Sequence, residues 1–217
     1  MAGWEKVNAA DFNPNNLISD DAFININDMS VDDIQCFLEG MGGILKDYSE
    51  AGRSAAQINY DSSHGYGHAS GTCICCRAID ITTSTGTVNP KVILVTMQKE
   101  QGLITRAVYS KYSLDWAMGY GRSDNLPPEE EYRGFTRQVE HAAWQLRFNY
   151  ERAEENKKTG YQVGDTIRVH NTYPNHHNAP REQYVYIDNR ATAALYRYTP
   201  HVYNGNYRFW HLYNEWF

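Results

Sequence analysis

The chain has 217 residues, of which 41% are hydrophobic and 21% charged, so it has the composition of a soluble globular protein that can bury its own core. Its formal net charge of −6, from 20 basic and 26 acidic side chains, argues against nucleic acid as a partner, because nucleic-acid binders present a basic face. No run of about 18 apolar residues occurs, which argues against a transmembrane helix, and residues 1–16 lack the apolar core of a signal peptide.

Two helices are predicted in the first third of the chain. The first follows Ser30, a good N-cap, and carries apolar residues at helical spacing until Gly42 and Gly43 end it. The second, shorter helix covers residues 54–63. The next segment is rich in glycine, serine and threonine and is interpreted as a loop, with residues 78–83 as a candidate strand.

Four cysteines occur, namely Cys36 and a cluster of Cys73, Cys75 and Cys76 in this loop. The cluster lacks the paired spacing of a zinc site, although a histidine of residues 64–68 could complete a metal site with it. A disulfide from Cys36 to the cluster is an alternative to free thiols. The neighbours Cys75 and Cys76 lie too close in sequence to pair without strain. No metal ion and no cofactor is expected for the function inferred below.

Residues 88–105, VNPKVILVTMQKEQGLIT, predict a helix that is capped by Asn89 and begins with a proline. Glu100 comes near its end, on the face that it shares with Ile93 and Met97. A carboxyl group against apolar neighbours is desolvated, and it would stay protonated near neutral pH, as a proton donor must. The alternative is that Glu100 lies beyond the buried part of the helix and is solvated.

The second half of the chain is predicted to contain three helices and a β-hairpin. A turn-rich connection over residues 113–131 precedes the clearest helix, in which apolar residues recur at helical spacing from Phe135 to Tyr150. Two segments with strand character, separated by a loop, predict the hairpin. These strands are expected at residues 163–170 and 183–188, and the last two helices at residues 189–198 and 207–217.

The predicted elements define the fold class and the domain organisation. Helices dominate and the β element is small, which predicts an α+β fold. Neither an internal repeat nor a low-complexity linker interrupts the sequence. We therefore expect one monomeric domain over residues 1–217, with residues 1–22 as an N-terminal extension.

Several stretches resemble the lysozyme-like superfamily, in its branch of goose-type lysozymes and soluble lytic transglycosylases. Residues 89–105 resemble the helix that carries the acidic residue of that branch, with Gln101 where serine is usual. DWAMGYGR, at residues 115–122, resembles the loop that follows and departs from it after Gly119. The catalytic domain of Gram-positive secreted cell-wall hydrolases is also similar, from about Phe23 to the C-terminus, through AAWQLR, ATAALYRYTPHVYNGN and FWHLYNEWF.

This resemblance implies a mainly helical, lysozyme-like α+β fold and a peptidoglycan hydrolase of the muramidase type. Such an enzyme cleaves the β-1,4 bond between the two amino sugars of the glycan strand, and Glu100 would be the general acid that protonates the leaving oxygen. Asp115 is the first candidate for a second carboxylate, and Asp124 is the other. The resemblance gives the substrate-binding candidates Gln101, Met118, Gly119, Tyr120, Tyr198 and Asn204.

Three alternative functions stay open beside the muramidase. They are lytic transglycosylation, endo-β-N-acetylglucosaminidase action on the other linkage, and glycan binding without cleavage. The predicted partner in each case is the peptidoglycan glycan strand, and neither nucleic acid nor a membrane is expected. The predicted location is secreted or attached to the cell wall, or carried by a phage.

Overall fold

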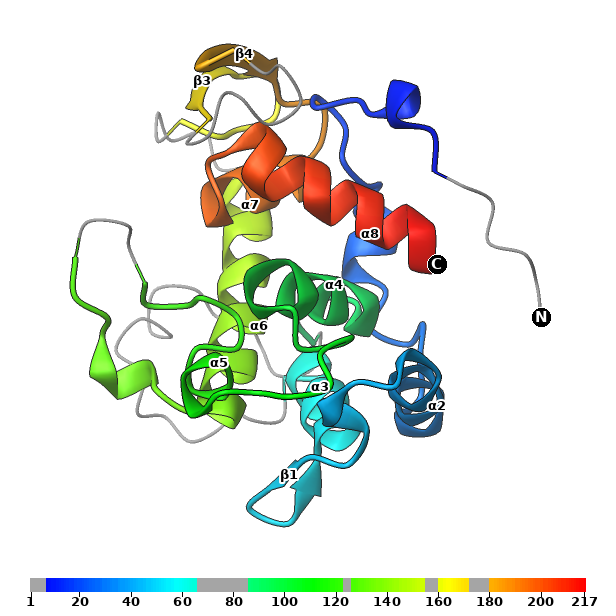
Figure 1. Cartoon of the computed structure of the whole chain (residues 1–217). Coiled ribbons are helices and arrows are strands. Elements are labelled where there is room, and N and C mark those ends of the chain that lie inside the picture. Colours follow the sequence, from blue (N-terminus) through cyan, green and yellow to red (C-terminus); the bar gives the residue numbers. More distant parts are fainter. Residues whose placement is uncertain (1–6, 66–85, 123–125, 155–159, 172–179) are drawn as a thin grey trace. The chain divides into compact units, whose positions relative to one another are not determined.

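The computed structural model describes residues 7–65, 86–122, 126–154, 160–171 and 180–217 (Figure 1). Helices predominate in these residues, and the short strands pair antiparallel, which confirms the α+β class. The candidate strand at residues 78–83 and the cysteine cluster at residues 73–76 lie outside the described residues. The chain divides into a central unit, Asn25–Gln145, and a terminal unit made of Met1–Ile24 and Leu146–Phe217.

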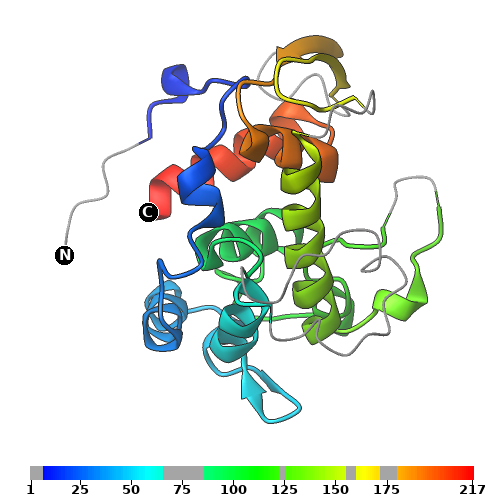
Figure 2. The same ribbon diagram turned by 180° about the vertical axis from the view of Figure 1, so that it is seen from behind.

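The central unit contains most of the helices that the sequence predicts. The prediction missed the hairpin of β1 (Ser49–Glu50) and β2 (Arg53–Ser54) and the short helix α5. Figure 2 shows α2 and α3 side by side, with the hairpin at one end of α3. The helices of this unit are α2 (Val31–Met41), α3 (Ala55–Ser63), α4 (Pro90–Gln101), α5 (Lys111–Asp115) and the first part of α6 (Phe135–Arg152), with 3₁₀ turns at Ile44–Lys46 and Glu130–Tyr132.

Helix α2 begins and ends at the residues that its sequence indicates. The Ser30 hydroxyl accepts the Asp33 N–H (3.2 Å), and the Asp33 carboxylate accepts the Ser30 N–H (2.9 Å), so the two form a capping box. Gly42 ends the helix in the left-handed region, at φ 71°. Ile34 and Leu38 are fully buried and give the helix its core-facing side.

Helix α4 is buried nearly all round, rather than along one face as its sequence suggests. The Asn89 side chain caps it by accepting the Lys91 N–H (2.8 Å), and Gly102 ends it at φ 68°. Every residue from Val92 to Lys99 is buried. The last turn of α4 therefore carries its polar side chains at the edge of a core.

The described part of the terminal unit contains a hairpin, the end of α6 and the helices α1, α7 and α8, and the sequence predicts all of these except α1. The hairpin strands pair in an antiparallel register that buries Val169 and Val185, which confirms the predicted strands. Helix α8 follows a π-helical turn, which the sequence did not indicate. The elements are α1 (Asp20–Ile24), the end of α6, β3 (Thr166–His170), β4 (Glu182–Tyr186), α7 (Arg190–Tyr198), the π-helical turn Val202–Tyr207 and α8 (Arg208–Trp216).

The N-terminal segment is held within the terminal unit by hydrogen bonds. The Leu17 N–H donates to the Thr192 hydroxyl (3.0 Å), and the Ala191 N–H donates to the Asp20 carboxylate (2.8 Å). These bonds join α1 and its preceding residues to the start of α7. Among the described helices, none has the length and apolar character needed to span a membrane.

Candidate functional site

Glu100 lies in the last turn of α4, beside a buried cation. Its Oε1 is 2.7 Å from Nζ of Lys99, whose side chain is only 4% exposed, whereas 26% of the Glu100 side chain is exposed. A buried ammonium group needs an anionic or polar partner, because the loss of its hydration is otherwise costly. Glu100 is therefore an ion-paired carboxylate at the edge of the core. It is not the isolated acid among apolar side chains that the sequence led us to expect.

The loop after α5 meets Glu100 at Gly119. The Gly119 backbone lies in the left-handed region (φ 70°), and a Cβ atom added there would lie 2.9 Å from Oε2 of Glu100. Both the conformation and the close approach favour glycine. The two stretches that the sequence singled out, the end of α4 and the DWAMGYG loop, are thus adjacent in space.

Gln138 of α6 fixes this loop from the core side, and the sequence interpretation missed it. Its Oε1 accepts the N–H groups of Met118 (3.3 Å) and Tyr120 (3.0 Å), and its Nε2 donates to the carbonyls of Tyr120 (2.9 Å) and Tyr132 (2.8 Å). Gln138 is completely buried. It lies three residues after Phe135, on the apolar face of α6. A polar side chain on an apolar face indicates a buried residue with hydrogen-bond partners, and this pattern could have identified Gln138 from the sequence.

An aromatic cluster of Tyr120, Tyr132 and His141 lies next to Gly119. The ring centroids of Tyr120 and Tyr132 are 4.8 Å apart in an edge-on arrangement, and Tyr120 stacks on His141 at 5.7 Å. All three side chains are half-buried. They offer a flat apolar surface with polar edges, which suits a ligand that has both kinds of surface.

Asp115, the candidate second carboxylate, is held by two cations. Its Oδ2 accepts from Nε of Arg133 (2.9 Å) and from Nζ of Lys111 (3.2 Å). Burial alone would raise the pKa of Asp115, but the hydrogen bonds from Arg133 and Lys111 outweigh it and hold the pKa below the ordinary value. The carbonyl of Asp115 also accepts the Gly134 N–H (3.0 Å). This geometry ties α5 to the start of α6.

Asp115→Asn should lower stability near neutral pH by about 1 kcal/mol, since exposed partners weaken an ion pair. The folded pKa lies below the ordinary value of 3.8. Between the two values the unfolded chain binds more protons, so stability rises with pH there. The stabilisation of the fold by the ionised Asp115 carboxylate is therefore complete above pH 3.8 and disappears as the pH falls through the folded pKa. Thermal unfolding across the acid range measures this, and equal losses at acid and neutral pH would contradict it.

The other sequence-predicted residues are distributed between the two units. Gln101 ends α4, and Met118 is completely buried, so Met118 offers no surface to a ligand. Tyr198 ends α7 and Asn204 lies in the π-helical turn, both in the terminal unit.

Some of the cysteine and metal hypotheses fall outside the described residues. Cys36 is exposed on α2 and forms no disulfide within the described part of the chain. Asp124, His68 and the cysteine cluster all lie outside that part. Where side chains are described, no group of three histidine, cysteine, aspartate or glutamate residues is arranged to hold a metal ion.

Comparison with known proteins identifies one family. The family described as LasA, N-terminal domain, matches residues 16–217, which include parts of both units. No curated protein and no solved structure matches the chain.

The family match corrects the function predicted from the sequence. A muramidase with Glu100 as general acid is wrong, because the chain matches a LasA domain rather than a lysozyme. The geometry gives a physical reason for the error. The prediction required a desolvated, proton-donating carboxyl group, whereas Glu100 is partly exposed and paired with Lys99. The chain belongs to the family of the LasA N-terminal domain.

Proposed function

We propose that this chain recognises bacterial peptidoglycan as part of a secreted, LasA-type protein that acts on the cell wall. The observation that carries the proposal is the family match over residues 16–217. LasA is a secreted staphylolytic peptidase, so the wall bond that a protein of this type cuts is a peptide bond. The role proposed for the described residues is to hold the wall polymer.

The candidate binding site is the end of α4 together with the loop at Gly119. One oxygen of Glu100 faces Lys99 and the other lies beside Gly119, a residue without a side chain, and 26% of the Glu100 side chain is exposed. A carboxylate accepts hydrogen bonds from the hydroxyl and amide groups that peptidoglycan carries in quantity. The Tyr120 ring, next in the chain, supplies apolar contact area beside these polar groups. Gln101 extends the same edge of α4.

Gln138 and Asp115 position this site and need not touch the ligand. Gln138 fixes the backbone on both sides of Gly119, and Asp115 fixes the helix that leads into the loop. A binding site whose backbone is held before the ligand arrives loses less conformational entropy on binding. Glu100 and Tyr120 are therefore the side chains whose removal should weaken binding without disturbing the loop.

Sedimentation with purified peptidoglycan sacculi tests the proposal. The unmodified protein should co-sediment with sacculi, and Glu100→Gln should bind about tenfold more weakly, as expected when a charged hydrogen-bond acceptor is lost. Tyr120→Ala should have a similar effect. The matched control is Glu39→Gln, which changes an exposed glutamate on α2. Failure of the unmodified protein to bind sacculi would overturn the proposal.

A second measurement addresses the class of bond that is cut. Sacculi incubated with the protein can be assayed in parallel for new amino groups and for new reducing ends. A peptidase of the LasA type releases amino groups, whereas a glycosidase releases reducing ends. Reducing ends without amino groups would contradict the proposed peptidase context.

A further inference from the structure

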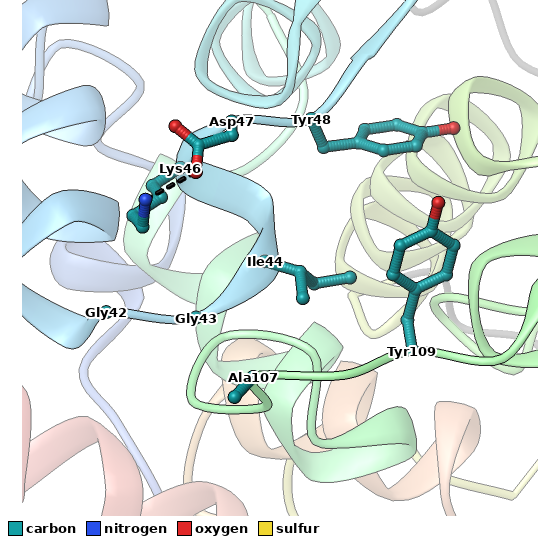
Figure 3. A pocket seen from close by; sticks show the side chains of 8 residues that line it. All are labelled: Gly42, Gly43, Ile44, Lys46, Asp47, Tyr48, Ala107 and Tyr109. Atoms are coloured by element: carbon teal, nitrogen blue, oxygen red, sulfur yellow. Dashed lines mark hydrogen bonds and ion pairs between the residues drawn. The ribbon is translucent and has the colours of Figure 1, made fainter.

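A pocket of about 420 Å³ opens in the central unit, on residues that the Glu100 site does not use (Figure 3). The residues that line it come from two segments of the chain, namely Gly42, Gly43, Ile44, Lys46, Asp47 and Tyr48 after α2, and Ala107 and Tyr109 after α4. Its volume falls in the range of pockets that bind small molecules and single sugar units.

The floor of the pocket is a rigid junction between two backbone segments. Gly43 lies so close to the segment after α4 that an added Cβ atom would sit 2.0 Å from the carbonyl oxygen of Ile104. The Ile44 N–H donates to the carbonyl of Arg106 (2.9 Å). Only glycine permits such an approach, and the hydrogen bond holds the two segments together. The pocket is thus preformed by the fold rather than by the rotamer of one side chain.

One wall of the pocket is aromatic, and its tyrosine ring, Tyr48, is held in place by its neighbours. Tyr48 packs edge-on against Phe135, with ring centroids 4.8 Å apart. Its hydroxyl lies 3.5 Å from Oε1 of Glu50, and Oε2 of Glu50 accepts the Thr136 N–H (2.8 Å) at the start of α6. Burial first, and then the Glu50 carboxylate, raise the pKa of Tyr48 to about 12, so its hydroxyl remains a hydrogen-bond donor.

The remaining walls leave room for a ligand with an apolar face and polar edges. Tyr109 is 49% exposed, and its hydroxyl points toward Tyr48 (Figure 3). The Ile44 side chain lies between these two tyrosines and Gly43. The methyl group of Ala107 completes the apolar surface. Such walls suit a pyranose ring, which presents C–H groups on its faces and hydroxyls at its rim.

The charges at the rim favour a neutral ligand. Lys46 and Asp47 form an ion pair with each other, and they are the charged side chains that line the pocket. Their charges compensate each other, so the side chains that line the pocket carry no net charge. A charged peptide stem would gain little attraction from such a lining, whereas a neutral sugar needs only hydrogen-bond partners for its hydroxyl and acetamide groups, which polar groups at the rim can supply.

From this geometry we infer that the pocket binds one neutral N-acetylated amino sugar of the peptidoglycan glycan strand, an inference that rests on the proposed function. The sugar face packs on Tyr48 and Tyr109, and its hydroxyl and acetamide groups bond to the rim. The pocket is a glycan subsite that is separate in sequence from the residues at Glu100.

The test is a titration with the β-1,4-linked trimer of N-acetylglucosamine, followed by NMR or tryptophan fluorescence. Tyr109→Ala should weaken binding about tenfold, as expected for the loss of a well-packed aromatic contact. Ala107→Trp should abolish binding by filling the pocket while it leaves both tyrosines in place. Tyr112→Ala removes a comparably exposed tyrosine, 47% exposed, from outside the pocket and should bind as the unmodified protein does. Melting temperatures show that each variant is folded.

The outcomes separate this inference from the proposed function. If the trimer fails to bind while sacculi are bound, the sugar subsite is wrong and the proposed function stands. If the trimer binds and sacculi do not, the subsite stands and the proposed function is wrong. Undiminished trimer binding by folded Tyr109→Ala and Ala107→Trp would also overturn the assignment to this pocket.

Discussion

Gln138→Leu is expected to lower the free energy of unfolding by about 3–5 kcal/mol, because it leaves several backbone groups without partners. Two N–H groups and two carbonyls of the loop and of the turn at Tyr132 bond to this one side chain. Each unsatisfied buried group costs about 1–3 kcal/mol, and those of the half-buried tyrosines recover part of this from water. Leucine has nearly the volume of glutamine, so a cavity contributes little to the loss.

Urea unfolding of the two proteins measures this effect. The matched control is Gln57→Leu, which removes a half-buried glutamine of α3 whose amide donates to Asp61 (2.7 Å). Water can replace that single bond, so the control should lose only about 0.5 kcal/mol. A loss near 0.5 kcal/mol for Gln138→Leu as well would mean that the loop rearranges and satisfies its own backbone.

Arg53→Met is expected to lower stability near neutral pH by about 2–3 kcal/mol, since it leaves two partly buried carboxylates without their cation. Arg53 on β2 bonds to Asp61 of α3 (3.0 Å) and to Glu140 of α6 (3.2 Å). The carboxylate side chains are only 14% and 15% exposed, so water screens their repulsion poorly. Methionine keeps the aliphatic part of the side chain, which isolates the effect of the charge.

The loss caused by Arg53→Met should depend on pH in a defined direction. Burial raises the pKa of Glu140 above the ordinary value, and the hydrogen bond and charge of Arg53 oppose that rise. A carboxyl group with a raised folded pKa destabilises the fold increasingly as pH rises through that pKa. Removal of Arg53 raises it further, so the variant should lose most near neutral pH and least in acid.

A double variant gives the control for Arg53. Glu140→Gln removes the carboxylate whose pKa burial raises, so Arg53→Met/Glu140→Gln should recover a substantial part of the stability lost in Arg53→Met. Additive losses in the double variant would contradict a direct interaction between the two side chains.

Regular periodicity made the long helices and the hairpin strands predictable. Helix α6 buries Phe135, Val139 and Leu146 at the spacing seen in the sequence, and Ser30 and Asn189 cap their helices as N-cap residues do. Strands β1 and β2 have two residues each, too few for an alternating pattern to emerge. The π-helical turn before α8 lacks a comparable sequence signature, because tertiary packing sets such turns.

The adjacency of Glu100 and Gly119 could be inferred, but the chemistry of Glu100 could not. Family-like motifs placed the two stretches together, and a glycine with φ 70° against the carboxylate fits that inference. Helical periodicity gives a residue's face but not the direction of a long side chain at its neighbour. Lys99 is an ordinary helix residue in the sequence, yet its ammonium is buried against Glu100 and changes the role of that acid. The same limitation hid Gln138, whose four partners lie in other segments.

The division of the chain into two units has a consequence for the order of events during synthesis. The central unit is one uninterrupted stretch, Asn25–Gln145, so all of its residues have left the ribosome before the terminal unit is complete. Helix α1 can dock only later, because the hydrogen bond from Leu17 reaches Thr192, which is synthesised 175 residues later. Phe23, fully buried in the finished protein and stacked on Tyr150 at 5.6 Å, stays exposed through that interval. A nascent chain of this family member thus exposes the Phe23 side chain until Tyr150 and α7 have been made, and chaperones hold exposed apolar side chains of this kind.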